Sequence, residues 1–226
     1  MTLNEILAPF GIELTEKELS KFELLYSTLI EWNEKMNLTA ITDREEVYVK
    51  HFADSLIPLK YFEGNVCDVG AGAGFPSLPL SIVAPSLDVT MIDSVDKKVK
   101  YLNAAAGVLG VKAKALHVRA EDFAKTKREY FDVVTARAVA QTATLAEYLL
   151  PLCKVGGKVI MYKGGDVEEE LKAAEKSVAV CGGKISKVEK YSFAGQSRTI
   201  VVVDKIEKTP LKYPRPQNKP RTQPIS

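Results

Sequence analysis

A glycine-rich loop with an acidic residue in front of it is the clearest chemical motif in the chain. It reads Asp-Val-Gly-Ala-Gly-Ala-Gly-Phe over residues 68–75 and stands between an apolar run and a helix-like stretch. Its glycines, Gly70, Gly72 and Gly74, let the backbone turn sharply and approach a ligand closely. A tight turn that serves packing alone is the alternative, but three alternating glycines behind Asp68 favour a ligand-binding loop.

The spacing within this loop indicates the class of ligand. The dinucleotide fingerprint G-x-G-x-x-G, counted from Gly70, requires a glycine where Phe75 stands. The Asp68 carboxylate suits a cationic group, such as the ammonium of an amino acid, and would repel a pyrophosphate at close range. The loop therefore argues against a nicotinamide dinucleotide as its ligand.

Polar residues also follow the next two apolar runs. Asp93 ends the second run, where a doubly wound fold presents an acid to a ribose diol, although Asp93 could instead only cap the following helix. Arg119, Ala120 and Glu121 follow the third run and place polar groups and a free backbone amide where an adenine edge would lie. A solvated turn is the alternative for these three residues. Together, the polar residues that follow these runs predict a binding site for a nucleoside.

Two further residues could orient a substrate. Arg137 follows the fourth apolar run, at the edge where ligands bind, and its guanidinium could hold a base or a carboxylate by paired hydrogen bonds. It could also simply pair with an acid at a helix end. His51 is expected on a helix that turns Val47, His51 and Asp54 to one face. A lone histidine on such a helix is usually a hydrogen-bonding partner, so we predict that it orients groups and does not transfer a proton.

The pattern of apolar residues predicts the elements that position these side chains. Helical spacing fills the N-terminal part, with capping boxes at Thr15 with Glu18 and at Thr42 with Glu45. From residue 66 onward, short apolar runs alternate with helix-length segments, which requires a parallel sheet covered on both faces. The expected parallel strands are 66–69, 89–92, 115–118, 131–135 and 158–162.

The C-terminal part ends differently. Segments 185–193 and 199–203 are joined by a short Ala-Gly-Gln connection, which predicts an antiparallel hairpin at the end of the sheet. Residues 208–226 contain five prolines, several lysines and arginines and no acid, so we expect no helix or central strand there. The chain is thus divided into a helical extension (1–60) packed on the core, a Rossmann-like α/β core (61–207) with a seven-stranded, mostly parallel sheet, and a basic, proline-rich tail.

Composition excludes several classes of protein. With 226 residues, 46% of them hydrophobic, the chain can bury one substantial core. No apolar run reaches the roughly 18 residues of a membrane span, and the N-terminus lacks a signal pattern, so we expect a cytoplasmic protein without membrane contact. Three scattered cysteines and two histidines argue against a disulfide framework and a metal site. The net charge of +2 does not by itself indicate a nucleic-acid partner.

Five segments taken together resemble one known family. They are Asn-Leu-Thr-Ala (37–40), His-Phe-Ala-Asp-Ser-Leu (51–56), the glycine loop with its helix (68–80), Arg-Ala-Glu (119–121) and Thr-Ala-Arg-Ala (135–138). The combination resembles the bacterial 16S ribosomal RNA guanine-N7 methyltransferases, also called glucose-inhibited division protein B, over nearly the whole chain. One departure is Ser77, where many members carry glycine, which gives a slightly bulkier start to the helix.

The resemblance implies a class I methyltransferase fold that uses S-adenosylmethionine and releases S-adenosylhomocysteine. Its substrate would be one guanosine in the 530 loop of 16S ribosomal RNA, presented as free RNA, a small ribosomal subunit or an assembly intermediate. A monomer is expected. The implied cofactor contacts are Gly70, Phe75, Ala120, Glu121 and Arg137, and the implied pocket residues are Asn37, His51, Arg119 and Arg137.

Three questions stay open at this point. The basic tail and Arg119 are candidates for RNA contact, but the tail could equally be a disordered, solubilising end. A non-catalytic RNA-binding module with the same fold is a second possibility, which the intact glycine loop, Asp93 and Arg137 disfavour. Methylation of DNA or of a small molecule is a third. The sequence Ala-Arg-Ala at 136–138 does not match the signature of amine-methylating DNA enzymes.

Overall fold

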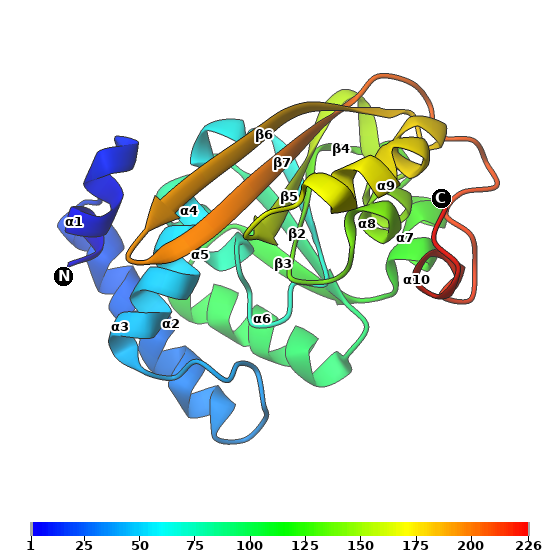
Figure 1. Ribbon diagram of the computed structural model, residues 1–226. Coiled ribbons are helices and arrows are strands. Elements are labelled where there is room, and N and C mark those ends of the chain that lie inside the picture. Colours follow the sequence, from blue (N-terminus) through cyan, green and yellow to red (C-terminus); the bar gives the residue numbers. More distant parts are fainter. Residues whose placement is uncertain (1, 226) are drawn as a thin grey trace.

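A seven-stranded sheet forms the centre of the computed structural model, which describes residues 2–225 (Figure 1). The strand order is β3-β2-β1-β4-β5-β7-β6. Strands β1 to β5 run parallel to one another, whereas β7 is antiparallel to both β5 and β6. The predicted α/β fold with a terminal hairpin is confirmed. The strands are β1 (Asn65–Val69), β2 (Asp88–Asp93), β3 (Ala113–His117), β4 (Phe131–Arg137), β5 (Cys153–Gly164), β6 (Gly183–Phe193) and β7 (Gln196–Lys205).

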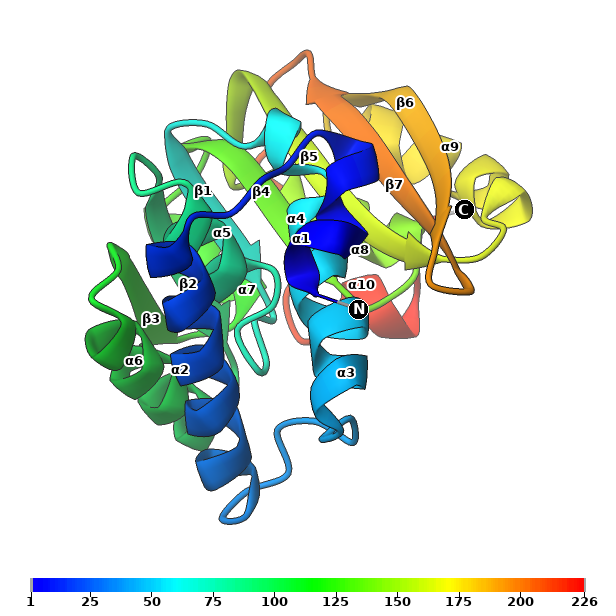
Figure 2. The ribbon, with the colours of Figure 1, turned by 90° about the vertical axis from the view of Figure 1, so that its left-hand side faces the viewer.

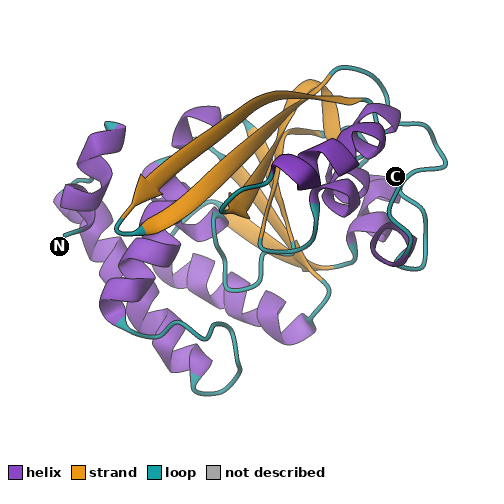
Figure 3. Cartoon of the chain, in the orientation of Figure 1, coloured by secondary structure: helices purple, strands orange, loops and turns teal. Residues whose placement is uncertain are grey.

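Helices cover both faces of this sheet (Figures 1 and 3). The α-helices are α1 (Leu3–Leu7), α2 (Glu16–Asn33), α3 (Arg44–Val47), α4 (Asp54–Leu56), α5 (Ser77–Val83), α6 (Asp96–Leu109), α7 (Ala120–Thr126), α8 (Thr142–Leu149), α9 (Glu168–Val180) and α10 (Lys219–Thr222). Single turns of other helix types are η1 (Ala8–Phe10), η2 (Tyr48–Ala53) and η3 (Leu59–Tyr61).

The alternation of side chains along each strand divides the interior into two hydrophobic cores. Val133 of β4 packs in the core with α1, α2, α5 and α6, whereas its neighbour Val134 packs in the core with α7, α8 and α9. Ile160 and Met161 of β5 divide in the same way. Figure 2 shows α1 and α2, which belong to the first of these cores, in front of the sheet. Strands buried on both faces explain why the sequence showed continuous apolar runs there.

The N-terminal helices share a hydrophobic core with the sheet, and the structure corrects one capping prediction there. The capping box that opens α2 is confirmed, since the amide of Glu18 donates to the Thr15 hydroxyl at 3.3 Å. The box predicted at Thr42 is wrong by one residue. Asp43 caps α3 instead and accepts from the amide of Glu46 at 3.0 Å, because a carboxylate is at least as good an N-cap as a hydroxyl. From α3 the chain continues through the wide π-turn η2 into α4.

The tail corrects a second expectation, because it does pack and does contain a helix. Pro220 lies in the first turn of α10, where a missing N–H costs no hydrogen bond. Arg215 donates to both carboxylate oxygens of the buried Glu147 on α8, at 2.7 to 3.1 Å. Arg128 donates to the carbonyls of Thr209, Pro210 and Tyr213 at 2.8 to 2.9 Å. The expectation that the tail contains no helix is therefore wrong at α10, and these side-chain contacts hold the tail on the core.

Within residues 2–225, none of the helices combines the length and the apolar character that a membrane crossing requires.

Replacing Arg215 by alanine should lower the free energy of unfolding by about 3 kcal/mol, because the Glu147 carboxylate would stay buried without its partner. Urea denaturation of the purified protein measures this difference. Lys212→Ala is the matched control, since Lys212 is an exposed cation of the same tail and its loss should change the free energy by less than about 0.5 kcal/mol. Equal stability of the two variants would mean that the tail is not fixed through Glu147.

Candidate cofactor and substrate site

The glycine loop after β1 lies in close contact with the segment after β4. Gly70 has a φ of +73°, and a Cβ added there would meet the Val139 side chain at 2.9 Å. The amides of Gly70 and Ala71 both donate to the carbonyl of Ile92, at 2.9 and 3.2 Å. Glycine is therefore required at residue 70 both for the left-handed turn and for the close approach of Val139.

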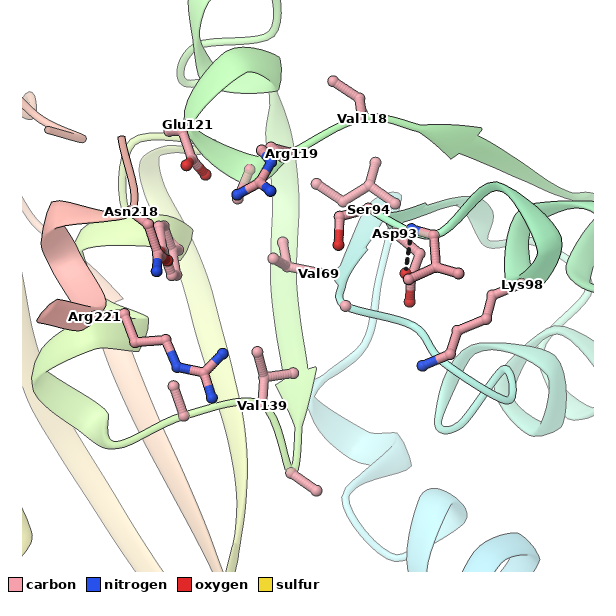
Figure 4. A pocket seen from close by; sticks show the side chains of 17 residues that line it. Val69, Asp93, Ser94, Lys98, Val118, Arg119, Glu121, Val139, Asn218 and Arg221 are labelled. Atoms are coloured by element: carbon pink, nitrogen blue, oxygen red, sulfur yellow. Dashed lines mark hydrogen bonds between the residues drawn. The ribbon is translucent and has the colours of Figure 1, made fainter. Parts of the chain in front are cut away.

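A cavity of about 360 Å³ opens at the carboxyl ends of β1, β2, β3 and β4, next to this loop (Figure 4). Its size is typical of a small-molecule site, and its position is the ligand-binding edge of doubly wound folds. Its walls combine apolar side chains with carboxylates and cations. The lining residues are Val69, Gly70, Ile92, Asp93, Ser94, Val95, Lys98, Val118, Arg119, Ala120, Glu121, Ala138, Val139, Ala140, Tyr148, Asn218 and Arg221.

Asp93 both holds the loop and faces this cavity. Its two carboxylate oxygens accept the backbone amides of Gly72 at 3.0 Å and of Val95 at 2.9 Å. Asp93 does not cap α6, since Val95 is the N-cap residue and no side chain caps this helix, and each of its carboxylate oxygens has a second lone pair. Asp93 can therefore accept a hydroxyl from the cavity while it fixes the glycine loop.

The start of α7 forms another wall of the cavity. Ala120 and Glu121 are its first two residues, and amides at the first turn of a helix have no acceptor within that helix. The Glu121 side chain is buried, and the exposed Arg119 also lines the cavity. The neighbouring wall, opposite Asp93 and Lys98, contains Asn218 and Arg221 of the tail, which the sequence interpretation missed because a proline-rich composition gave no sign that the tail would pack.

A second cavity, of about 340 Å³, adjoins the first and shares Ala138 and Ala140 with it. It lies between the N-terminal helices and the ends of β4, β5 and β7. Most of its polar side chains are hydrogen-bond donors. The lining residues are Ile41, Lys50, His51, Asp54, Arg137, Ala138, Ala140, Tyr162, Lys163, Gly164 and Arg198.

Arg137 is the centre of the polar network in this second cavity. Its guanidinium donates to the Asp54 carboxylate at 2.8 Å and to Nδ1 of His51 at 2.9 Å. Because Nδ1 accepts this hydrogen bond, the imidazole proton lies on Nε2, which donates to the Thr39 hydroxyl at 3.0 Å. Both predicted residues, His51 and Arg137, are therefore brought together, and each nitrogen of the imidazole is already engaged.

His51 is held as a neutral ring. Burial, and next the charge of Arg137, lower its pKa from 6.5 to about 3. The ring also stacks on Phe75, with 4.6 Å between the ring centroids. Phe75, expected at the cofactor, lines neither cavity and instead fixes the plane of the imidazole.

Arg198 is a functional residue that the sequence analysis missed. Its Nε donates to the Asp54 carboxylate at 3.1 Å, so that Asp54 joins two guanidinium groups from β4 and β7. A single arginine near the start of a terminal strand carries no recognisable spacing. Lys163 of β5, also not anticipated, donates to the carbonyl of Ala140 at 2.9 Å and pairs with Glu170 at 2.6 Å.

Asp68 lies behind the glycine loop and outside both cavities. It is fully buried, and the Ser77 hydroxyl donates to its Oδ2 at 2.7 Å. Burial raises its pKa to about 7. Within residues 2–225 its Oδ1 is buried without a hydrogen-bond partner, so it can still accept from a donor that reaches through the loop. Ser77, the departure from the family pattern, thus supplies a direct partner for this acid.

The remaining predicted residues lie around the cavities without lining them. A Cβ added at Gly74 would overlap the Leu78 side chain at 2.4 Å, so this glycine serves the packing of the loop on α5. Gly72 acts through its amide on Asp93. Asn37 is exposed on the connection after α2 and lines neither cavity, so its assignment to the catalytic pocket stays a prediction.

Comparison with known proteins identifies the family. Residues 18–201 match the family described as rRNA small subunit methyltransferase G, or GidB. The chain belongs to this family. The methyltransferase G of an Exiguobacterium species (strain AT1b) is 53% identical over 230 residues, which cover 98% of this chain and 97% of the relative. That of Geobacillus thermodenitrificans is 51% identical, covering 95% and 94%.

Solved structures confirm the class I methyltransferase fold expected for a GidB protein. A 16S rRNA (adenine(1408)-N(1))-methyltransferase from Catenulisporales acidiphilia, solved with its cosubstrate SAM, aligns with a TM-score of 0.54 and 12% identity, covering 70% of this chain and 92% of the other. The Methanococcus jannaschii fibrillarin pre-rRNA processing protein aligns with a TM-score of 0.53 and 20% identity, covering 69% and 74%.

Because of Asp68, the folded protein should lose stability as the pH rises, and the variant Asp68→Asn should not show this loss. The carboxyl has a pKa of about 7 when folded and an ordinary value of 3.8, so between these values the folded protein keeps a proton that the unfolded chain releases. The stability from this group is complete below about pH 4 and declines up to pH 7, by at most about 1.4 kcal/mol per pH unit.

Urea denaturation of both proteins from pH 4.5 to 8 tests this. The wild-type protein should lose stability relative to Asp68→Asn as the pH rises. His51 acts in the opposite direction, since its lowered pKa costs stability as the pH falls from 6.5 toward 3, but it is present in both proteins and cancels in the difference. Parallel pH curves would show that Asp68 is ionised in the folded state.

Proposed function

We propose that the protein transfers a methyl group from S-adenosylmethionine to N7 of one guanosine in the 530 loop of 16S ribosomal RNA. The observation that carries this proposal is the meeting of two cavities at Ala138 and Ala140. One has the polar groups that an adenosyl group requires, and the other is lined by hydrogen-bond donors suited to a base. Membership of the GidB family supports the substrate.

The first cavity fits the cofactor by its chemistry. Apolar side chains, among them Val69, Val118 and Val139, can pack on a flat adenine, and the Asp93 carboxylate can accept ribose hydroxyls. The unpaired Oδ1 of Asp68, directly behind the loop, can accept from an ammonium. When bound, S-adenosylmethionine supplies a methyl group on a positively charged sulfur.

The second cavity has no need of a proton acceptor. Guanine N7 carries an in-plane lone pair and no proton, so the enzyme must position the base and does not have to deprotonate it. His51 fits this requirement because it is neutral, weakly basic and engaged at both nitrogens. Its role is to hold Arg137 in place. The cations Lys50 and Arg198, which line the same cavity, can donate to the guanine O6 next to N7.

We also propose the compartment and the oligomeric state in which the protein acts. Small ribosomal subunits and their assembly intermediates are cytoplasmic, and we propose that a monomer meets them there. The exposed Arg119 stands at the rim of the first cavity and can neutralise a phosphate of the bound RNA.

The direct test is transfer of labelled methyl groups from S-adenosylmethionine to undermethylated small subunits and to free 16S RNA. Cleavage directed at N7-methylguanosine then maps the product. We expect label at a single guanosine of the 530 loop, and the better acceptor identifies the stage of assembly. Absence of label from both acceptors, in a protein that binds S-adenosylhomocysteine, would overturn the RNA substrate while leaving the cofactor site intact.

His51→Gln should retain more activity than His51→Ala. A glutamine amide can accept from Arg137 and donate to Thr39, whereas alanine removes one of the partners that fix the guanidinium and leaves only Asp54 and the carbonyl of Lys50, which should cost about tenfold or more in kcat/KM. The pH profile separates positioning from proton transfer. With a His51 pKa of about 3, any ionisation of kcat/KM near pH 6.5 should persist in His51→Gln, since the Asp68 carboxyl has a pKa of about 7. A wild-type ionisation at that pH that disappears in His51→Gln would instead make His51 a general base.

A further inference from the structure

The C-terminal segment forms one wall of the cavity assigned to the cofactor. Asn218 and Arg221 line it together with Tyr148 of α8. Figure 4 shows the Arg221 side chain extending toward the cavity from the side opposite Asp93 and Lys98, with Asn218 near Glu121. Residues at the end of the chain thus face the loops that follow β1, β2 and β3.

This wall is fixed to the core on both sides of the cavity-lining residues. The Tyr148 hydroxyl donates to Oδ1 of Asn218 at 3.0 Å, and the Thr144 hydroxyl donates to the carbonyl of Pro220 at 2.9 Å. Beyond α10, Arg215 donates to the carbonyl of Gln223 at 2.7 Å. The same Arg215 binds the buried Glu147, so this ion pair adds to the hydrogen bonds that anchor the segment.

The polar groups of this wall complement those of the facing wall. Since Oδ1 of Asn218 already accepts from Tyr148, its NH2 group is left to donate into the cavity. Arg221 adds a guanidinium with five N–H donors and no acceptor. Asp93 contributes a carboxylate from the opposite side of the cavity, and Glu121 contributes another beside Asn218. A ligand with acceptor nitrogens on one edge and donor hydroxyls on another satisfies both walls, and an adenosyl group has both.

We propose that Asn218 and Arg221 bind the adenosyl half of the cofactor, so that the C-terminal segment is a part of the cofactor site. This inference rests on the proposed use of S-adenosylmethionine. A general attraction of the tail for RNA phosphates would draw equally on Lys219, the neighbouring exposed cation on α10, yet only Arg221 lines the cavity. The distinction between these two side chains makes the assignment testable.

Isothermal titration of the full-length protein with S-adenosylhomocysteine measures the effect without any RNA. Arg221→Ala and Asn218→Ala should each raise the dissociation constant, Arg221→Ala by about tenfold or more. Lys219→Ala is the matched control and should stay within about twofold of the wild type. Point variants are preferable to a truncation, which would remove Arg215 and leave Glu147 unpaired. Unchanged urea midpoints confirm that each variant is folded.

Two outcomes overturn the inference, and they are distinguishable from failure of the proposed function. If the wild-type protein binds S-adenosylhomocysteine and Arg221→Ala binds it with the same affinity, the tail is not part of the cofactor site. The cofactor assignment itself is then unaffected. Equal weakening by Lys219→Ala and Arg221→Ala would assign the effect to charge rather than to contact. A wild-type protein that does not bind S-adenosylhomocysteine would overturn the cofactor assignment itself, and with it this inference.

Discussion

The buried Asp54 carboxylate joins three parts of the fold in one polar network. It accepts from Arg137 of β4 at 2.8 Å and from Arg198 of β7 at 3.1 Å, and only 5% of its side chain is exposed. A buried carboxylate without these partners would be strongly destabilising. The π-turn before α4 places His51 on the same guanidinium. The position of Arg137, and therefore the shape of the second cavity, depends on the N-terminal helices being packed against both strands.

Two buried titratable groups, His51 within this network and Asp68 outside it, have pKa values shifted in opposite directions. His51 shares its surroundings with Arg137 and stays neutral, with a pKa of about 3. Asp68 has only the Ser77 hydroxyl as a direct partner, and burial raises its pKa to about 7. His51 thus resists gaining a proton, and Asp68 resists losing one. Burial therefore favours the neutral form of both groups in the folded protein.

Much of the fold and part of the site could be predicted from the sequence. The glycine loop, Asp93 and Glu121 are local signals, because a strand end and a helix start fix their positions. His51 and Asp54 lie on one helix, and their shared face follows from helical spacing. Arg198, Asn218 and Arg221 could not be found in this way, since only packing between distant segments brings them to the cavities. Composition even misled for the tail, where Arg215 and the buried Glu147 outweigh the effect of the prolines.

The distance along the chain between these partners has a consequence for biosynthesis. Asp54 is made early, Arg137 and Arg198 follow much later, and the tail with Arg221 comes last. Domains generally fold as units during synthesis, but the first helices leave the ribosome before either arginine is available to them. The first cavity has all its walls only once Arg221 has been synthesised, and the second only once Arg198 has. A nascent chain that stops between Asp54 and Arg137 therefore holds this acid without either arginine.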